Sequence, residues 1–424
     1  MTGDVLPELA WRGLVHQVTD EGLGARMAAE PFSLYHGIDV TADSLHVGSL
    51  LGVLTLRRIQ AHGHRPVVVL GGGTSMIGDP SGRRTERPLL TRDQIDANGA
   101  AIRAQLESLL DFGGGDSSAR LVNNADWLAP ATVIDFLRDV GKHFTVNAML
   151  AKEAVAARLE DGISFTEFSY MLLQAYDFLH LFDVAGCRLQ VGGSDQWGNI
   201  TAGIDLIRRV RSAEAFGLTW PLVVKADGTK FGKSESGNVW LDPARTSPYR
   251  FFQFWVNTDD RDVSKYLRFF TFLERERIGE LEAEVAERPG SREAQRVLAR
   301  EVTALVHGQA AAEAAERASS ILFGGDLDDV DPDTIAEVFA DVPSSELPRA
   351  RLEGDGALLV DLLAESGLVA SKSAARQAVD QGGVSVNGRR AAEVDRRVGV
   401  ADLLGDRFVV LRRGKRSYHV LHVR

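Results

Sequence analysis

The chain has 424 residues, of which 25% are charged and 44% hydrophobic, a composition typical of a folded protein with room for two or three domains. Its single cysteine, Cys187, excludes a disulfide framework and a cysteine-based metal cluster. No apolar run reaches about 18 residues, and charged residues interrupt the first stretch, so we expect a cytoplasmic protein with no membrane segment.

Charge is distributed unevenly along the chain. The net charge of −11 argues against a nucleic-acid partner for the protein as a whole. From Ala357 to Arg424, however, 12 Lys and Arg stand against 7 Asp and Glu. A basic tail on an acidic body predicts a local site for a polyanion.

The first strand-to-helix corner carries two unusual residues. Residues 1–30 indicate one or two amphipathic helices, and a strand over 32–40 and a helix over about 44–59 follow. The first N–H groups of that helix suit a phosphate. Gly48 lies where a helix disfavours glycine, and His46 precedes it by two residues. Gly48 could let a flat ring or sugar approach while His46 donates to phosphate, or the two could be a packing glycine and a surface histidine; this stretch alone leaves both open.

A second strand ends in a loop rich in glycine. The apolar run 65–71 is typical of a strand buried on both faces, and the strand–helix–strand order predicts a parallel pair. The loop 71–87 is first glycine-rich and then basic, as expected where backbone approaches a ligand and cations face phosphate. It lacks the ending of a P-loop and the spacing of a dinucleotide fingerprint.

The next notable element is a helix over 165–179, after an expected helix, strand and helices at 95–110, 120–124 and 130–160. Tyr170, Gln174 and Asp177 are spaced i, i+4 and i+7, so they share one face of this helix. Such a polar stripe among aromatic residues needs partners. It predicts a small-molecule pocket or, alternatively, a structural hydrogen-bond network.

A second strand-to-helix corner follows at 188–210. The strand 188–193 ends at Ser-Asp-Gln-Trp-Gly-Asn (194–199), where a helix begins. Ligands of open parallel sheets bind at the carboxyl ends of the strands. The polar residues expected to face one crevice there are Asp39, Asp79, Asp195 and Gln196.

A short cationic loop follows a strand predicted at 221–225. A turn at Asp227-Gly228 leads to Lys230-Phe-Gly-Lys-Ser234. Two lysines and a hydroxyl around a glycine could close on a triphosphate and neutralise developing charge. The alternative is a solvated hairpin tip.

Beyond residue 247 the alternation of strands and helices stops. Residues 250–308 read as helical, and 324–356 as an acidic linker with one short helix at 334–339. The last segment predicts two short helices, a hairpin at 383–390 and two strands. Arginines at the turns of a small sheet suit a structured phosphate backbone.

Two motifs together carry a resemblance to a known family. His46-Val-Gly-Ser49 resembles the first signature of class I aminoacyl-tRNA synthetases, usually HIGH, and Lys230-Phe-Gly-Lys-Ser234 resembles the second, usually KMSKS. In this order, and with other matching residues, they resemble bacterial tyrosyl-tRNA synthetases along the whole chain. The other residues are Tyr35, the loop Gly-Asp-Pro-Ser-Gly (78–82), Tyr170, Gln174, Asp177 and Gly-Gly-Ser-Asp-Gln-Trp-Gly-Asn (192–199).

The resemblance implies an α/β fold of three domains and a linker. Expected are a Rossmann-like parallel-sheet catalytic domain (1–247), an α-helical anticodon-binding domain (248–323), an acidic linker (324–356) and a small α+β RNA-binding domain (357–424). The last resembles a module shared with a ribosomal protein of the small subunit (S-four-like).

The implied activity is tyrosine–tRNA ligation. L-Tyrosine and ATP would form tyrosyl-adenylate and pyrophosphate, and the tyrosyl group would pass to the terminal adenosine of tRNA(Tyr). No permanently bound cofactor and no protein metal site are expected, and Mg²⁺ would arrive with ATP. The resemblance further implies a homodimer, and we expect its interface near residues 130–180.

The resemblance also assigns roles to residues, with the substrate phenol between Tyr35 and Asp177. The expected catalytic residues are Thr41, His46, Lys230, Lys233 and Ser234. Tyrosine would be bound by Tyr35, Asp79, Tyr170, Gln174, Asp177 and Gln196. ATP would be bound by Gly37, Asp39, His46, Gly48, Ser49, Gly193, Asp195 and Lys233, and its phosphates also by Arg83, Arg87 and Lys230. tRNA would be bound by Lys372, Arg376, Arg389 and Arg390.

The chain departs from the family pattern in three places. Ser49 replaces the second histidine of HIGH, Phe231-Gly232 replaces Met-Ser, and Arg83 stands where lysine is common. Each change keeps a donor or charge at the phosphate-facing positions. Two rival hypotheses are a tryptophanyl enzyme, which has no use for a Tyr-Asp pair aimed at a phenol, and an RNA-binding protein with a synthetase-like body but no catalysis.

Overall fold

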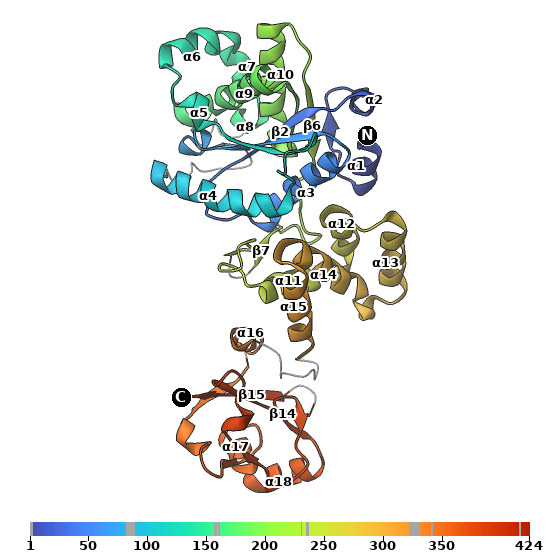
Figure 1. Cartoon of the computed structure of the whole chain (residues 1–424), viewed down its shortest axis with the longest axis vertical. Coiled ribbons are helices and arrows are strands. Elements are labelled where there is room, and N and C mark those ends of the chain that lie inside the picture. Colours follow the sequence, from blue (N-terminus) through green and yellow to red (C-terminus); the bar gives the residue numbers. More distant parts are fainter. Residues whose placement is uncertain are drawn as a thin grey trace. The chain divides into compact units, whose positions relative to one another are not determined.

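The computed structural model describes residues 3–81, 90–156, 159, 162–229, 231–234, 237–321, 331–340, 342–414 and 417–424. The chain divides into two compact units (Figure 1). Unit 1 comprises Met1–Thr246 and Thr258–Leu298, and unit 2 comprises Ser247–Asn257 and Ala299–Arg424.

Unit 1 is built on a six-stranded sheet of order β1-β6-β5-β2-β3-β4. Its strands are β1 (Gln17–Val18), β2 (Ser33–Ile38), β3 (Arg65–Leu70), β4 (Arg120–Asn123), β5 (Cys187–Gly193) and β6 (Phe216–Trp220). All pairs are parallel except β1 with β6 at the edge. Strands β3 and β6 are buried almost throughout, as helices on both faces require. The predicted Rossmann-like parallel sheet is confirmed.

Helices cover both faces of this sheet. Figure 1 shows α3 and α4 on one side and α9 and α10 on the other. The helices up to residue 211 are α1 (Leu6–Arg12), α2 (Leu23–Ala29), α3 (Val47–Ala61), α4 (Arg92–Leu109), α5 (Ala125–Leu128), α6 (Val133–Asp139), α7 (Val146–Leu150), α8 (Glu153–Ala156), α9 (Phe165–Ala185) and α10 (Trp197–Arg211). Helix α9 begins where the Ser164 side chain accepts from the Glu167 N–H and ends at Gly186 with φ 59°.

One strand was predicted in the wrong place. The last parallel strand is β6, at 216–220, and the expected strand at 221–225 is not one. Leu222 and Val224 are 52% and 57% exposed, so the apolar run there does not enter the sheet. Pro221, which lacks an N–H, directly follows the strand's end. Gly217 and Thr219 within β6 obscured its apolar pattern in the sequence.

The helical stretch predicted at 250–308 is present and is shared between the two units. Helices α12 (Asp260–Phe270) and α13 (Arg275–Glu287) lie in unit 1, and α11 (Pro248–Val256) and α15 (Gln309–Ile321) lie in unit 2. Helix α14 (Glu293–His307) spans the division. Among the described residues, no helix is long and apolar enough to cross a membrane.

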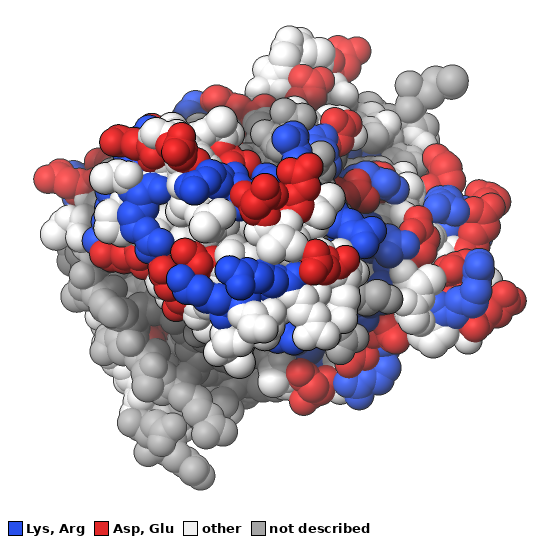
Figure 2. Space-filling model, turned by 90° about the horizontal axis from the view of Figure 1, so that it is seen from below, with Lys and Arg blue, Asp and Glu red and all other residues white. Residues whose placement is uncertain are grey.

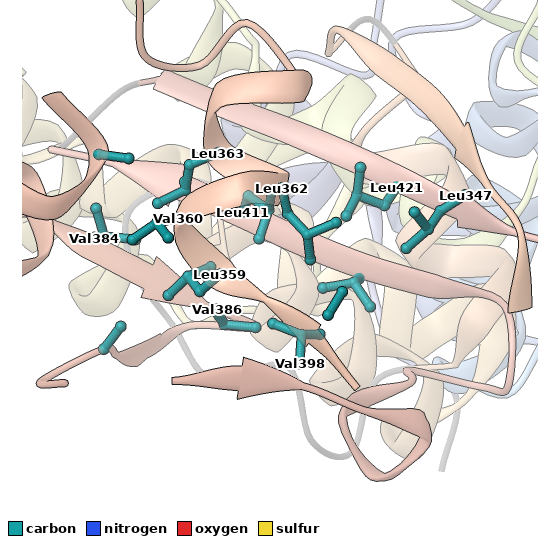
Figure 3. Packing of buried hydrophobic residues seen from close by; sticks show 14 of the residues in the cluster. Leu347, Leu359, Val360, Leu362, Leu363, Val384, Val386, Val398, Leu411 and Leu421 are labelled. Carbon is teal, nitrogen blue, oxygen red and sulfur yellow. The ribbon is translucent and has the colours of Figure 1, made fainter. Parts of the chain in front are cut away.

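Unit 2 contains a five-stranded sheet of order β12-β11-β14-β15-β9. Its strands are β9 (Ser344–Leu347), β11 (Val384–Val386), β12 (Arg389–Arg390), β14 (Phe408–Arg413) and β15 (Ser417–Val423). Helices α17 (Leu359–Glu365) and α18 (Lys372–Asp380) and the pair β10 (Ala357–Leu358) and β13 (Arg397–Val398) complete this region. Figure 3 shows Leu359 and Leu363 of α17 packed with side chains of the strands.

The segment expected as an acidic linker (324–356) is folded where the structure describes it. It holds helix α16 (Pro332–Val338), close to the predicted 334–339, and strand β9, which pairs in parallel with β15. Leu347 is 4% exposed and belongs to the same core cluster as Leu359 (Figure 3). The charged composition of this stretch hid the apolar contacts that join it to the sheet. The domain boundaries expected from the sequence otherwise stay predictions.

Candidate active site

A cavity of about 490 Å³ opens at the carboxyl ends of β2, β3 and β5 in unit 1. The crevice expected to unite Asp39, Asp79, Asp195 and Gln196 is confirmed, because all four line this cavity. Ten further residues predicted for the site also line it: Tyr35, Gly37, Thr41, His46, Gly48, Ser49, Tyr170, Gln174, Asp177 and Gly193. The first and last of these residues, Tyr35 and Gln196, are far apart in the sequence, and the sheet topology brings the local groups together.

Part of the predicted phosphate site falls outside the described residues. Arg83, Arg87 and Lys230 lie there, as do the side chains of Lys233 and Ser234. The backbone of 233–234 forms β7 and pairs with β8 (Gly237–Asn238), where Lys233 faces Asn238. Since Asn238 lines the cavity, the second signature lies on a hairpin whose other strand borders the site.

Asp177 is the buried carboxyl group at one end of the cavity. It is 3% exposed and receives a hydrogen bond on each oxygen: Trp127 Nε1 donates to Oδ1 over 2.7 Å and Asn124 Nδ2 donates to Oδ2 over 3.0 Å. Burial raises its pKa to about 7, although both hydrogen bonds oppose that shift. The site therefore holds a desolvated carboxyl group in a fixed orientation.

Tyr35, on β2, lies near Asp177. It is 1% exposed, packs edge-on against Phe178 with ring centroids 5.3 Å apart, and donates from its hydroxyl to the Gln174 carbonyl over 3.4 Å. Burial and the charge of Asp177 raise its pKa well above the usual value, so the hydroxyl stays neutral. The pair offers a hydroxyl and a carboxyl group to one polar atom of a ligand.

A chain of amide hydrogen bonds borders the middle of the cavity. Gln196 Nε2 donates to Asp79 Oδ2 over 2.8 Å, and Gln174 Nε2 donates to Gln196 Oε1 over 3.2 Å. Asn199 Nδ2 donates to Gln174 Oε1 over 2.9 Å. Burial and the charges of Asp39, Asp79 and Asp177 raise the pKa of Tyr170 well above its usual value. The polar stripe of α9 is thus both a cavity wall and part of a hydrogen-bond network.

His46 caps helix α3 at the other end of the cavity. Its Nδ1 accepts from the N–H groups of Gly48 and Ser49 over 3.0 and 3.2 Å. An accepting Nδ1 carries no proton, so the neutral ring is protonated at Nε2. Burial lowers the pKa of His46, which favours this neutral form. The cap therefore leaves one N–H donor on a ring that lines the cavity.

The glycine at 48 is explained by the same cap. A Cβ there would lie 2.9 Å from His46 Cε1 and 3.0 Å from Nδ1, closer than real Cβ atoms approach. Glycine is therefore needed at 48 because the ring of His46, and not only a ligand, lies against its backbone. The interpretation of a surface histidine is wrong, because His46 is partly buried and bonded to the start of the helix.

Comparisons with known proteins decide the family. A model described as tRNA synthetases class I (W and Y) matches residues 27–324, and one for a tyrosine–tRNA ligase C-terminal domain matches 334–421. Tyrosine–tRNA ligase of Roseiflexus castenholzii is 57% identical over 421 residues, 99% of each chain, and that of Geobacillus stearothermophilus is 54% identical over 420. The chain belongs to the tyrosine–tRNA ligase family of class I synthetases.

Solved structures agree with this family. A mitochondrial tyrosyl-tRNA synthetase of Aspergillus nidulans, truncated at its C-terminus, is 32% identical, has a TM-score of 0.68 and covers 76% of this chain and 94% of its own. A tryptophanyl-tRNA synthetase of Encephalitozoon cuniculi is 14% identical with a TM-score of 0.54, covering 73% of this chain and 87% of its own. The second likeness shows the shared fold alone.

Asn124, His36 and Gly52 line the cavity and Trp127 bonds to Asp177, and none of these four residues was predicted from the sequence. Asn124 follows β4 and Trp127 lies on α5. The one sequence signal for them is the pair of asparagines, 123 and 124, at the end of that strand. His36 interrupts an apolar strand: its Nδ1 lies 3.2 Å from the Val191 carbonyl and its ring meets Trp220 edge-on. Gly52 of α3 lies below that ring. Burial lowers the pKa of His36 to about 4.

Proposed function

We propose that this protein is a tyrosine–tRNA ligase that forms tyrosyl-adenylate from L-tyrosine and ATP and then transfers the tyrosyl group to the terminal adenosine of tRNA(Tyr). The observation that carries the proposal is the buried pair of Tyr35 and Asp177, with Asp177 held by Trp127 and Asn124. Relatives at 57% and 54% identity carry the same activity in their names.

The tyrosine phenol binds between Tyr35 and Asp177. Its O–H donates to the Asp177 carboxylate, and the Tyr35 hydroxyl turns from the Gln174 carbonyl to donate to the phenol oxygen. Phenylalanine in the same place would displace water from Asp177 and Tyr35 without offering either a hydrogen bond, and a tyrosyl enzyme is the standard example of this kind of rejection.

The polar groups of the substrate meet the middle of the cavity. The ammonium group donates hydrogen bonds to Asp79, Tyr170 and the Gln174 amide oxygen. The carboxylate meets Gln196, whose amide already bonds to Asp79. Asp195 accepts from the ribose hydroxyls of ATP, while Gly37, Asp39, Gly48 and Gly193 line the nucleotide. Holding both reactants in one cavity converts a bimolecular step into an intramolecular one.

Activation is a displacement at the α-phosphorus. A carboxylate oxygen of tyrosine forms the new P–O bond while the bond to the bridging oxygen of pyrophosphate breaks, and the leaving group takes that electron pair. The Nε2–H of His46 and the hydroxyl of Thr41 donate to phosphate oxygens. Lys230, Lys233, Ser234, Arg83 and Arg87 add charge and donors that act most strongly as pyrophosphate departs.

Mg²⁺ arrives with ATP. Among the residues the structure describes, no cluster of three or more His, Cys, Asp or Glu side chains could hold a metal ion. Mg²⁺ of this kind binds mainly through nucleotide phosphates and keeps several waters. When bound, it would neutralise charge on the β- and γ-phosphates.

Basic side chains of unit 2 serve the tRNA backbone. Lys372 and Arg376 lie on α18 and Arg389 and Arg390 form β12, and all four are exposed. One face of the molecule carries Lys and Arg in groups separated by Asp and Glu (Figure 2). Such an alternation suits contacts with a shaped RNA at chosen phosphates.

The active protein is a cytoplasmic homodimer. Large apolar side chains stand exposed on the segments predicted to form the interface: Val133 at 73%, Ile134 at 72%, Leu137 at 51%, Val146 at 60% and Phe165 at 77%. Exposed apolar groups of this kind mark association sites. Phe165→Asp should shift the mass in solution from dimer to monomer, and a wild-type protein that is a strict monomer would contradict the dimer.

Tyrosine-dependent exchange of pyrophosphate into ATP tests the activity. We expect exchange with tyrosine and not with tryptophan or phenylalanine. Exchange with tryptophan instead would support a tryptophanyl enzyme. No exchange with any amino acid would support an RNA-binding protein without catalysis.

A further inference from the structure

The segment between β6 and β7 is fastened to helix α12 within unit 1. This segment, 221–232, carries the backbone that leads into the second signature. Residues of α12 contact it at two of its backbone groups and at one aromatic ring. None of these contacts was part of the site expected from the sequence.

Asp262 and Lys265 hold the first half of the segment. Asp262 is 3% exposed, and its Oδ2 accepts from the Ala226 N–H over 2.8 Å. Its Oδ1 accepts from Lys265 Nζ over 3.0 Å, and the same ammonium group donates to the Val224 carbonyl over 2.8 Å. One ion pair of α12 therefore satisfies an N–H and a carbonyl of a stretch that has left the sheet.

Phe231 holds the second half. Its ring stacks on Phe270 with centroids 5.3 Å apart and planes at 19°, and it meets Tyr266 edge-on at 4.9 Å. Phe270 and Tyr266 are 0% and 3% exposed. Phe231, which stands where the signature usually has methionine, therefore packs against two buried aromatic side chains of α12.

The same segment also contacts the start of α3. Gly232 lies beside Val47, because a Cβ on Gly232 would be 3.0 Å from Val47 Cγ2. The Gly232 carbonyl accepts from the Val239 N–H over 2.9 Å, and the Val239 carbonyl accepts from the Val47 N–H over 3.0 Å. Val47 directly follows His46, so these bonds join the second signature to the first.

We propose that Phe231 is a positioning residue for adenylate formation, and that α12, through Phe231 and Asp262, sets where the signature backbone lies against the His46 end of α3. The inference rests on the proposed function. Lys230 and Lys233 flank Phe231 and Gly232 in sequence, so fixing this backbone limits where their charges can act. Misplacing such groups by about 1 Å can cost on the order of a hundredfold in rate.

Phe231→Ala tests the proposal in the full-length protein with two readouts. Loss of the stacked ring should raise hydrogen exchange at the Ala226 amide on the order of tenfold, because opening of the segment becomes easier. It should also lower the kcat of tyrosine-dependent pyrophosphate exchange about tenfold and leave the KM for tyrosine within about twofold. Phe231→Leu should recover part of both effects.

Val224→Ala is the matched control. Val224 lies in the same segment, its side chain is 57% exposed, and its backbone carbonyl, which the substitution keeps, accepts from Lys265. We expect wild-type kinetics of pyrophosphate exchange. We also expect wild-type hydrogen-exchange protection at the Ala226 amide, after correction for its intrinsic exchange rate. Asp262→Asn, which keeps the size of the side chain but weakens the ion pair, should raise exchange at the same amide.

The proposal is overturned if Phe231→Ala matches Val224→Ala in both readouts, or if the KM for tyrosine rises as much as kcat falls. A wild-type protein without tyrosine-dependent exchange would sink the proposed function. The hydrogen-exchange comparison would still decide whether Phe231 anchors the segment.

Discussion

The two ends of the cavity differ in how completely their polar groups are paired. At the Tyr35 end, Asp177 is buried and both its oxygens are bonded by protein donors. At the His46 end, Thr41 is exposed and Ser49 partly buried, and the ring of His46 keeps an N–H donor on the cavity wall. Selection of a side chain needs a desolvated partner fixed in advance, whereas activation needs donors that meet charge as it develops.

The strongest test of this difference is Asp177→Ala. It leaves the half-buried Trp127 and the buried Asn124 donors without their acceptor and removes the acceptor for the phenol. We expect transition-state stabilisation for tyrosine to fall by roughly 3 to 5 kcal/mol, which lowers kcat/KM by about two to four powers of ten, with the KM for ATP within about twofold. Steady-state pyrophosphate exchange with each substrate varied in turn measures both.

Asp183→Ala on the same helix is the control for Asp177→Ala. Asp183 lies near the helix end and forms an exposed ion pair with Arg211. Its removal should change tyrosine activation by less than about threefold. An equal loss of tyrosine and ATP binding in Asp177→Ala would contradict the separation of the two ends.

The stability of the protein should depend on pH through Asp177. Its folded pKa of about 7 lies above the ordinary value of 3.8, so the folded state keeps a proton that the unfolded state loses. The resulting loss of folding free energy is absent below the unfolded pKa, grows as pH rises toward 7 and is constant above 7. The free energy of unfolding of Asp177→Asn, relative to that of wild type, should therefore rise by about 2 to 3 kcal/mol from pH 5 to pH 8. Urea unfolding at each pH measures this difference.

The amide group of the substituted side chain also turns an N–H₂ donor toward one of the two protein donors. This contact changes the free energy of unfolding by an amount that does not vary with pH. Only the slope of the difference between variants reports the buried carboxyl group. A difference that stays flat between pH 5 and pH 8 would mean that Asp177 titrates as an ordinary carboxylate, and the contrast between the two ends would weaken.

Gly52→Ala tests how tightly the His36 side of the cavity is packed. A Cβ there would lie 2.9 Å from His36 Nε2 and 3.1 Å from Trp220 Cζ2. We expect a loss of about 1 to 3 kcal/mol in the free energy of unfolding. Gly99→Ala on α4 is the control, because its Cβ would meet Leu70 at an ordinary 3.7 Å, and it should stabilise by about 0.5 to 1 kcal/mol. Equal effects of the two substitutions would show that the His36 ring yields freely.

The sequence predicted more of the site than of the chain's finer connections. Tyr170, Gln174 and Asp177 follow from helical spacing, and Asp39 and Asp195 from the rule that ligands meet strand ends. Asn124 and Trp127 could not be predicted this way, since they reach Asp177 only because β4 pairs beside β3. Strand β9 was hidden for a related reason, because its partner β15 is about 75 residues away and its own residues are mostly polar.

The smallest expected effect belongs to Ser49, the position that departs from the first signature. Its N–H donates to His46 Nδ1 over 3.2 Å, whereas its hydroxyl oxygen lies 3.5 Å from the same atom. The backbone therefore makes the cap, and Ser49→Ala keeps it. We expect kcat/KM for ATP to fall by no more than about threefold, the worth of one weak neutral hydrogen bond. His46→Ala removes both the cap and the Nε2–H donor and should cost far more in the same assay. A tenfold loss in Ser49→Ala would place the hydroxyl itself on the nucleotide.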